Sequence, residues 1–267
     1  MPLLQLVLVA LIQGITEFLP VSSSGHLILL PNLIGMEDQG QAIDVAVHVG
    51  TLAAVVLFFW KDVGNAFGGL FTLACGRRDT EGARLALGLI VATIPTVILG
   101  AFLHFSGLSD ALRSIAVIGW TMVGFGVVLY FADQWGKTLK TMGDWGLKDA
   151  LIMGLWQMLA LIPGTSRSGI TITGARQLGY SREDGARVAM LMSIPTIIAS
   201  GLLLGLDVAT NGNAALLRDM AIASALAMIS ALGALTLMMW LLHSVSFTPY
   251  VIYRVILGVI LLVVAYS

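Results

Sequence analysis

Two short polar segments interrupt an otherwise apolar chain, and both carry residue types suited to phosphate chemistry. The first polar segment, residues 13–26, is QGITEFLPVSSSGH, and the second, residues 157–169, is QMLALIPGTSRSG. Each joins an apolar helical run, a proline, a cluster of hydroxyl residues and a glycine, which predicts two half-helices with a polar bend between them. Glu17, His26 and Arg167 lie in these segments, and titratable side chains at such membrane depths are costly and usually functional.

The first polar segment supplies a carboxylate, hydroxyls and an imidazole. Gln13 and Glu17 are four residues apart, which places them on one face of a helix. Pro20 ends that helix, and three serines then stand where the next half-helix needs an N-cap: Ser22, Ser23 and Ser24. His26 can act as an acid or a base near neutral pH, and it is close enough in sequence to address Ser23 or a phosphate bound there.

The second polar segment repeats this layout and adds a permanent cation. Three hydroxyl residues surround Arg167, namely Thr165, Ser166 and Ser168. A guanidinium can bind two phosphate oxygens at once. Free backbone N–H groups at a helix start also form an anion site. We therefore expect the two half-helix N-termini to make a pocket for a phosphate.

Structural interpretations of several of these residues remain as alternatives. Ser22 and Ser24 could act only as helix caps, because serines after a proline commonly do so. Arg167 could serve as a salt-bridge partner that holds the two segments together through Glu17, either alone or in addition to binding phosphate. His48 is interpreted as a hydrogen-bonded packing residue. Arg254 is expected to neutralise a buried partner or to snorkel.

The composition is that of a polytopic membrane protein. Hydrophobic residues make up 58% of the chain, charged residues 11%, and the mean hydropathy is +0.94, which a soluble globule could not accommodate on its surface. The longest polar connections, residues 61–84 and 132–149, are too short to be soluble domains, so we expect one membrane domain over residues 1–267. The net charge of −1 argues against nucleic acid as a partner, and the single Cys75 excludes an intrachain disulfide.

The hydrophobic runs predict an all-α fold with six transmembrane helices and two re-entrant helical hairpins. Uncharged runs of the length needed to cross the hydrocarbon lie at residues 85–109, 114–132, 188–206 and 220–242. Two shorter runs, 45–60 and 255–267, gain length from their neighbours. The remaining apolar pieces form pairs too short to span separately, and these predict the hairpins, at residues 3–35 and 147–179. Such hairpins are tolerated where their irregular backbone is covered by protein or lines a wet cavity.

The basic residues set the expected orientation, because Lys and Arg accumulate on the cytoplasmic side. With the connection after Trp60 inside, only Arg113 and Arg218 face outward. Ten basic residues then lie at or near the cytoplasmic face: Lys61, Arg77, Arg78, Arg84, Lys137, Lys140, Lys148, Arg176, Arg182 and Arg187. Both termini are then outside, and the two hairpins enter from opposite sides.

This order of elements predicts an inverted-topology repeat, with one half at about residues 1–135 and the other at about 145–267. The spacing from Gln13 to Gly25 equals that from Gln157 to Gly169, and three crossings follow each hairpin. In such folds the binding site lies near the membrane midplane, where the half-helix N-termini point at anionic groups.

The two polar segments, taken together, resemble the signature motifs of the bacterial undecaprenyl-diphosphatases, the bacitracin-resistance membrane phosphatases. The resemblance covers nearly the whole chain, including SFTPYVIYR at residues 246–254. It implies hydrolysis of undecaprenyl diphosphate to undecaprenyl phosphate and inorganic phosphate at the outer face of the bacterial cytoplasmic membrane. That reaction recycles the lipid carrier for peptidoglycan synthesis and confers bacitracin resistance. The partners so implied are the prenyl diphosphate and membrane lipids, and a homo-oligomer is left open.

The resemblance also implies roles for individual residues. Glu17, Ser23, His26 and Arg167 match the family's catalytic set, and the phosphate-contacting hydroxyls match Ser22, Ser24, Ser166 and Ser168, to which the residue pattern adds Thr165. A divalent cation, Mg²⁺ or Ca²⁺, is expected at Glu17 with Gln13. The family often has Glu at the position of Gln13, so a site with two carboxylates is not available here.

We expect Ser23 to attack the terminal phosphorus with His26 assisting proton transfer, and direct attack by water stays an alternative. The rival function class is a transporter or flippase for a phosphorylated lipid or another anion, because inverted repeats with broken helices are also a transport architecture. The proximity of Ser23 and His26 favours the enzyme, since a passive binding site needs no nucleophile.

Overall fold

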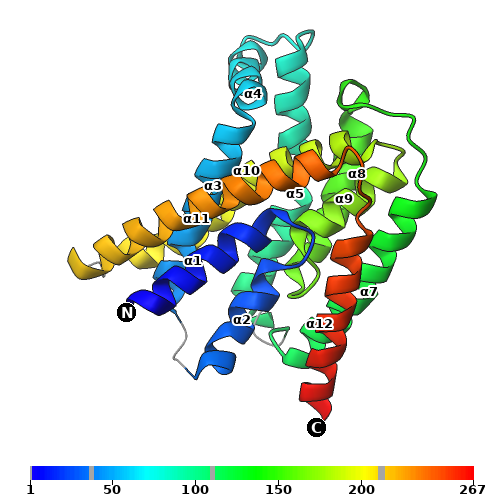
Figure 1. The fold of residues 1–267 in the computed structure, drawn as a ribbon. Coiled ribbons are helices and arrows are strands. Elements are labelled where there is room, and N and C mark those ends of the chain that lie inside the picture. Colours follow the sequence, from blue (N-terminus) through cyan, green and yellow to red (C-terminus); the bar gives the residue numbers. More distant parts are fainter. Residues whose placement is uncertain (1, 36–38, 109–111, 210–213) are drawn as a thin grey trace.

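The computed structural model describes residues 2–35, 39–108, 112–209 and 214–267, and the description here concerns those residues. Their regular secondary structure is helical apart from one isolated β-bridge between Lys140 and Tyr180 (Figure 1). The first half contains α1 (Leu3–Phe18), α2 (Ser23–Ile34), α3 (Gln41–Phe58), α4 (Trp60–Ala74), α5 (Glu81–Ser106) and α7 (Ile115–Trp135). The second contains η1 (Met142–Asp144), α8 (Leu147–Met158), η2 (Leu159–Leu161), α9 (Arg167–Gln177), α10 (Arg182–Ala209), α11 (Ala214–Leu241) and α12 (Thr248–Tyr266).

Six of these helices are long and apolar enough to cross a membrane, which confirms the expected number of crossings. They are α3, α5, α7, α10, α11 and α12. The two spans with the shortest uncharged runs gain length at their N-terminal ends, as expected: α3 begins at Gln41 and α12 at Thr248. The expected run 85–109 corresponds to α5, and its last residue, 109, lies outside the described residues.

The polar connection expected at residues 61–84 is largely helical, which corrects the sequence-based prediction. Helix α4 occupies most of it, and α5 already begins at Glu81. The reason is amphipathic spacing: Val63 and Ala66 lie one turn apart and pack against the main hydrophobic core, while the opposite face of α4 is exposed. Cys75, directly after this helix, is a free and exposed thiol.

Two of the short helices pack against long helices from the opposite half of the chain. Helix α1 lies along α11, and α8 lies along α5. Both contacts are close because glycine faces backbone: a Cβ added at Gly14 would lie 2.6 Å from the Ala227 carbonyl oxygen, and one at Gly154 would lie 2.4 Å from that of Ala92. The spans α7 and α12 pack on each other, as do α3 and α10. The two halves of the chain are therefore intertwined through α1 and α8.

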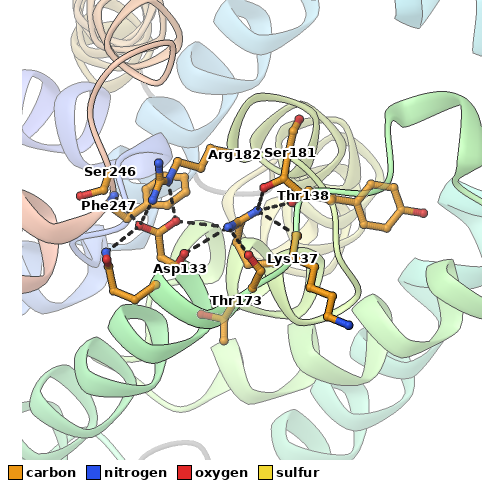
Figure 2. A network of polar contacts seen from close by, with 12 residues as sticks. Asp133, Lys137, Thr138, Thr173, Ser181, Arg182, Ser246 and Phe247 are labelled. Carbon is orange, nitrogen blue, oxygen red and sulfur yellow. Dashed lines mark hydrogen bonds and ion pairs between the residues drawn. The ribbon is translucent and has the colours of Figure 1, made fainter.

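A buried carboxylate ties four helices together at the end of the bundle where α7 stops (Figure 2). The Asp133 side chain is fully buried and accepts hydrogen bonds from Arg182 at 2.7 and 3.1 Å. The Arg176 Nε lies 3.3 Å from the same carboxylate, and the backbone N–H of Phe247 donates to it at 3.1 Å. These contacts join α7 to α9, α10 and the start of α12, which fixes the end of α9 opposite to Arg167.

Candidate active site

The two polar segments adopt the same backbone turn before their second helix. Ser22 and Ser166 have φ of 75° and 69°, and within the described ranges they are the only non-glycine residues with positive φ. Each serine oxygen accepts a hydrogen bond from the N–H of the glycine three residues later, at 3.4 Å for Gly25 and 3.2 Å for Gly169. Left-handed backbone costs a non-glycine residue about 1–2 kcal/mol and clusters at functional sites. Both helix starts are thus capped in a strained turn.

The tips of these turns meet in the interior of the protein. The Arg167 Nη2 donates to Glu17 Oε1 at 2.8 Å, across 150 residues of sequence. Both side chains are largely buried, with 13% of Arg167 and 7% of Glu17 exposed. The Ser168 hydroxyl adds a second link by donating to the carbonyl oxygen of Leu19 at 2.9 Å. The structure therefore places the cation of one segment directly against the carboxylate of the other.

The second oxygen of Glu17 receives the hydroxyl of Ser23. Ser23 Oγ donates to Glu17 Oε2 at 2.7 Å, and Gln13 Nε2 donates to the same atom at 2.9 Å. The Ser23 proton thus already points at a carboxylate that could accept it. Gln13 and Glu17 share a helix face, as their spacing predicts.

The hydrogen bonds of His26 go to Ser22 and Tyr253, and its expected role in proton transfer with Ser23 stays a prediction. Its Nδ1 lies 2.7 Å from the Ser22 carbonyl oxygen, and its Nε2 lies 2.6 Å from the hydroxyl of Tyr253. The two rings also stack, with their centroids 5.7 Å apart. Both ring nitrogens are therefore already occupied, and Glu17, not His26, holds the Ser23 hydroxyl.

His48 lies beside Glu17, although the sequence interpretation treated it as a packing residue. Its Nδ1 lies 2.7 Å from the Asp44 carbonyl oxygen, and its Nε2 lies 3.9 Å from Glu17 Oε2. Its side chain is 40% exposed, because it lines the cavity described below. A histidine on an apolar span next to an isolated carboxylate, Asp44, was the available sequence signal.

Arg254 supports the second polar segment and does not snorkel, and among the residues that the structure describes it pairs with no carboxylate. Its side chain is fully buried, and Nη2 donates to the carbonyl oxygens of Gly164 at 3.2 Å and Thr165 at 2.7 Å. The turn before Arg167 is thereby fixed from behind by α12. Tyr253, the neighbouring residue, holds His26 in the same way, so SFTPYVIYR contributes to both segments.

A cavity of about 540 Å³ opens in front of this cluster. Glu17, Ser23, His48 and Arg167 line its polar part, together with Ser22, Ser24 and Ser166. Apolar side chains line the remainder, among them Leu27, Val49, Ile197 and Leu202. Thr165 and Ser168 are fully buried and do not belong to this lining, so they are placed to support the turn and not to face a ligand directly.

The oxygen atoms that the protein places at Glu17 are too few to hold a hard divalent cation, so a bound substrate and water would have to supply the others. Gln13 Oε1 is buried without a hydrogen-bond partner next to Glu17, and an amide oxygen is a ligand type that Mg²⁺ and Ca²⁺ accept. Among the described residues no group of three His, Cys, Asp or Glu side chains is arranged to hold a metal. A cation here would take Glu17 and Gln13 from the protein and its other oxygens from substrate and water.

Comparison with known proteins finds a family and relatives that match this chain over nearly its full length. The family described as "Bacitracin resistance protein BacA" matches residues 6–260. An undecaprenyl-diphosphatase of Ruegeria sp. (strain TM1040) is 76% identical, and one of Jannaschia sp. (strain CCS1) is 68% identical, each over the whole of both chains. Undecaprenyl-diphosphatase 1 of Rhodospirillum rubrum is 47% identical over all of this chain and 96% of its own length. The chain belongs to the BacA family of bacitracin resistance proteins.

Proposed function

We propose that this protein hydrolyses undecaprenyl diphosphate to undecaprenyl phosphate and inorganic phosphate. The reaction recycles the lipid carrier for peptidoglycan synthesis and confers bacitracin resistance. The observation that carries the proposal is the contact of Ser23 and Arg167 with the two oxygens of Glu17 at one cavity. A nucleophile, a base and a phosphate-binding cation meet there. The names of the close relatives support the choice of substrate.

The cavity suits an amphiphilic substrate because its lining changes from polar to apolar. The diphosphate would bind at Arg167 and the two capped helix starts, where backbone N–H groups favour anions. The first prenyl units would lie against side chains such as Leu27 and Val49. At about 540 Å³ the cavity is too small for a long prenyl chain, so the rest of the tail would extend between helices into the lipid.

In the proposed reaction Ser23 Oγ attacks the terminal phosphorus while Arg167 stabilises the charge on the transferred phosphoryl group. The Ser23 proton passes to Glu17, which already accepts its hydrogen bond. The bond from phosphorus to the bridging oxygen breaks, and undecaprenyl phosphate leaves. Water then hydrolyses phospho-Ser23 to release inorganic phosphate. In this scheme His26 is a positioning residue, because its contacts with the Ser22 carbonyl oxygen and the Tyr253 hydroxyl hold the start of α2 in place.

We further propose that a divalent cation, Mg²⁺ or Ca²⁺, binds at Glu17 and Gln13 together with oxygens of the substrate. When bound, it would neutralise negative charge on the diphosphate. Gln13 Oε1 supports this assignment because it is buried beside Glu17 and free to accept a ligand.

The proposed architecture is a single domain, residues 1–267, built as an inverted repeat in the bacterial inner membrane. The matching turns at Ser22 and Ser166 support it, as does the exchange of packing partners between α1 with α11 and α8 with α5. In this arrangement α1–α2 and α8–α9 are re-entrant hairpins from opposite sides, both termini are outside, and the cavity opens to the outer face. The balance of basic residues supports that orientation.

Purified protein in detergent should release inorganic phosphate from a prenyl diphosphate, and a chelator should remove most of that activity. Detergent removes the sealed compartment that transport requires, so phosphate release under these conditions identifies a hydrolase. Phosphate is measured with and without the chelator and after Mg²⁺ or Ca²⁺ is restored. Binding of prenyl diphosphate without any turnover would instead favour the transporter.

Replacing Gln13 by Glu should lower the divalent cation concentration that gives half-maximal activity by about tenfold, because a second carboxylate strengthens a hard-cation site. The measurement is the activity as a function of Mg²⁺ concentration. Gln39→Glu is the matched control, since Gln39 lines the cavity in front of Glu17 and donates to Asp44 instead of Glu17. An unchanged Mg²⁺ dependence in Gln13→Glu would contradict the assignment of the ion to this position.

A further inference from the structure

A second pocket lies between the end of α7, the following loop at residues 136–140 and the end of α9. It has a volume of about 460 Å³ and shares no lining residue with the cavity at Glu17. The loop is held against the chain after α9, because the N–H groups of Leu139 and Lys140 both donate to the carbonyl oxygen of Gly179 at 2.9 Å. The pocket is therefore a formed feature of the fold.

One wall of this pocket is apolar and exposed. Phe131 and Trp135 stack one helical turn apart, with their ring centroids separated by 4.6 Å. Trp135 is 76% exposed and Leu139 is 77% exposed. Since α7 is a candidate membrane span that ends at Trp135, these side chains lie where membrane proteins place aromatic residues, at the boundary between hydrocarbon and headgroups. This wall could hold the upper part of an acyl chain.

The other side of the pocket carries surplus positive charge. Beneath the loop, the Asp133 carboxylate pairs with two guanidinium groups, those of Arg176 and Arg182 (Figure 2). Arg176 Nη2 donates to the carbonyl oxygen of Gly136, which lines the pocket, at 2.9 Å. Lys137 is exposed, and its side chain extends away from the Asp133 network. Asp133 thus balances only one of its two guanidinium partners, and Lys137 adds a further positive charge at the pocket.

Lys140, which also lines the pocket, is neutralised separately. Its Nζ lies 2.6 Å from Asp149 Oδ2 and 5.3 Å from the ring centroid of Tyr180. Lys137 is consequently the lining residue whose charge is available to a ligand. A ligand for this pocket needs an anionic headgroup to meet Lys137 and an apolar chain to lie on Trp135.

We propose that this pocket binds an anionic phospholipid, with its phosphate at Lys137 and one acyl chain along Phe131 and Trp135. Basic pockets between membrane helices are recognised by anionic lipid headgroups. A zwitterionic lipid fits less well, because its own ammonium group would meet the surplus positive charge of the Asp133 network. The site is separate from the proposed hydrolysis and does not depend on it.

The test is native mass spectrometry of the full chain in detergent, titrated with phosphatidylglycerol or with phosphatidylcholine of the same acyl chains. The first phosphatidylglycerol should bind more tightly than phosphatidylcholine. Lys137→Gln should weaken that binding by about fivefold, the effect of one basic residue near an anionic headgroup. Lys137→Arg should retain it. Phosphate release by each variant reports whether the protein is folded.

Lys61→Gln is the matched control, because Lys61 is also exposed beside an exposed tryptophan, 5.6 Å from the ring centroid of Trp60, but lines neither cavity. This variant should bind phosphatidylglycerol like the unmodified chain. Equal binding of the two lipids, or equal effects of Lys61→Gln and Lys137→Gln, would overturn the proposal. Retained phosphatidylglycerol binding in Lys137→Gln would overturn it as well.

Discussion

Ser23→Ala should lower the rate of phosphate release by about a thousandfold or more, the effect expected when a nucleophile that acts with its base is removed. The physical reason is the direct hydrogen bond from Ser23 to Glu17 at 2.7 Å, which gives the hydroxyl a base within reach. The measurement is the initial rate of phosphate release from a prenyl diphosphate at saturating cation. Single-turnover experiments with the unmodified protein should also reveal phosphate bound covalently to Ser23.

The control for this variant is Ser200→Ala, which removes another cavity-lining hydroxyl. It should keep a rate within a few-fold of the unmodified chain. If Ser23→Ala retained a rate within about tenfold, the phosphoserine route would be rejected in favour of direct attack by water on the diphosphate. Glu17 would then be the candidate to activate that water.

Arg167→Ala should lower phosphate release by about a thousandfold, the effect typical of an arginine that stabilises a phosphoryl group during transfer. Arg167→Lys keeps the charge but loses the bidentate geometry, so it should be intermediate. Arg218→Ala is the control, because this arginine also pairs with a carboxylate, Asp219, but is 73% exposed and lies outside the cavity. Near-normal turnover by Arg167→Ala would contradict its assignment.

This variant should also destabilise the protein, because it leaves Glu17 buried without its cation. Breaking a buried pair by removing one partner costs about 3–5 kcal/mol. Combining Arg167→Ala with Glu17→Gln removes the unpaired charge and should recover most of the thermal stability without recovering activity. The thermal stability of the double variant thus reports the structural role of the ion pair, while activity is judged from Arg167→Ala alone, because Glu17 is itself the proposed base. Recovery of both properties together would mean that Arg167 only holds the segments together.

The six membrane spans could be predicted from sequence because each needs only an uninterrupted apolar run, a property of local composition. Helix α4 was missed for the opposite reason. Its segment contains Lys61 and Asp62, and charges in a short stretch resemble a loop when hydropathy alone is considered. Its helical state depends on packing of one face, through Val63 and Ala66, against a core that the local sequence does not reveal.

The residues of the two polar segments stood out in the sequence because a charge or imidazole in an apolar chain is unusual. The side chains that contact them in the fold could not be identified from the sequence. His26 contacts Tyr253 across 227 residues, and His48 reaches Glu17 from a different helix, so both contacts are set by tertiary packing. The same applies to Arg254, whose buried carbonyl acceptors cannot be identified from its own neighbours. The sequence pattern singled out the two segments and their residue types, whereas the pairing of individual side chains required the fold.

The ion pair between Glu17 and Arg167 gives the guanidinium an internal partner whenever the cavity holds no phosphate. In the proposed mechanism an incoming diphosphate would therefore compete with a carboxylate that is already in place, which would lower the net affinity for any anion. The same competition would act after the reaction, because Glu17 would pair with Arg167 again as inorganic phosphate leaves. We therefore expect the resting contact to limit product inhibition and to favour rapid emptying of the cavity between catalytic cycles.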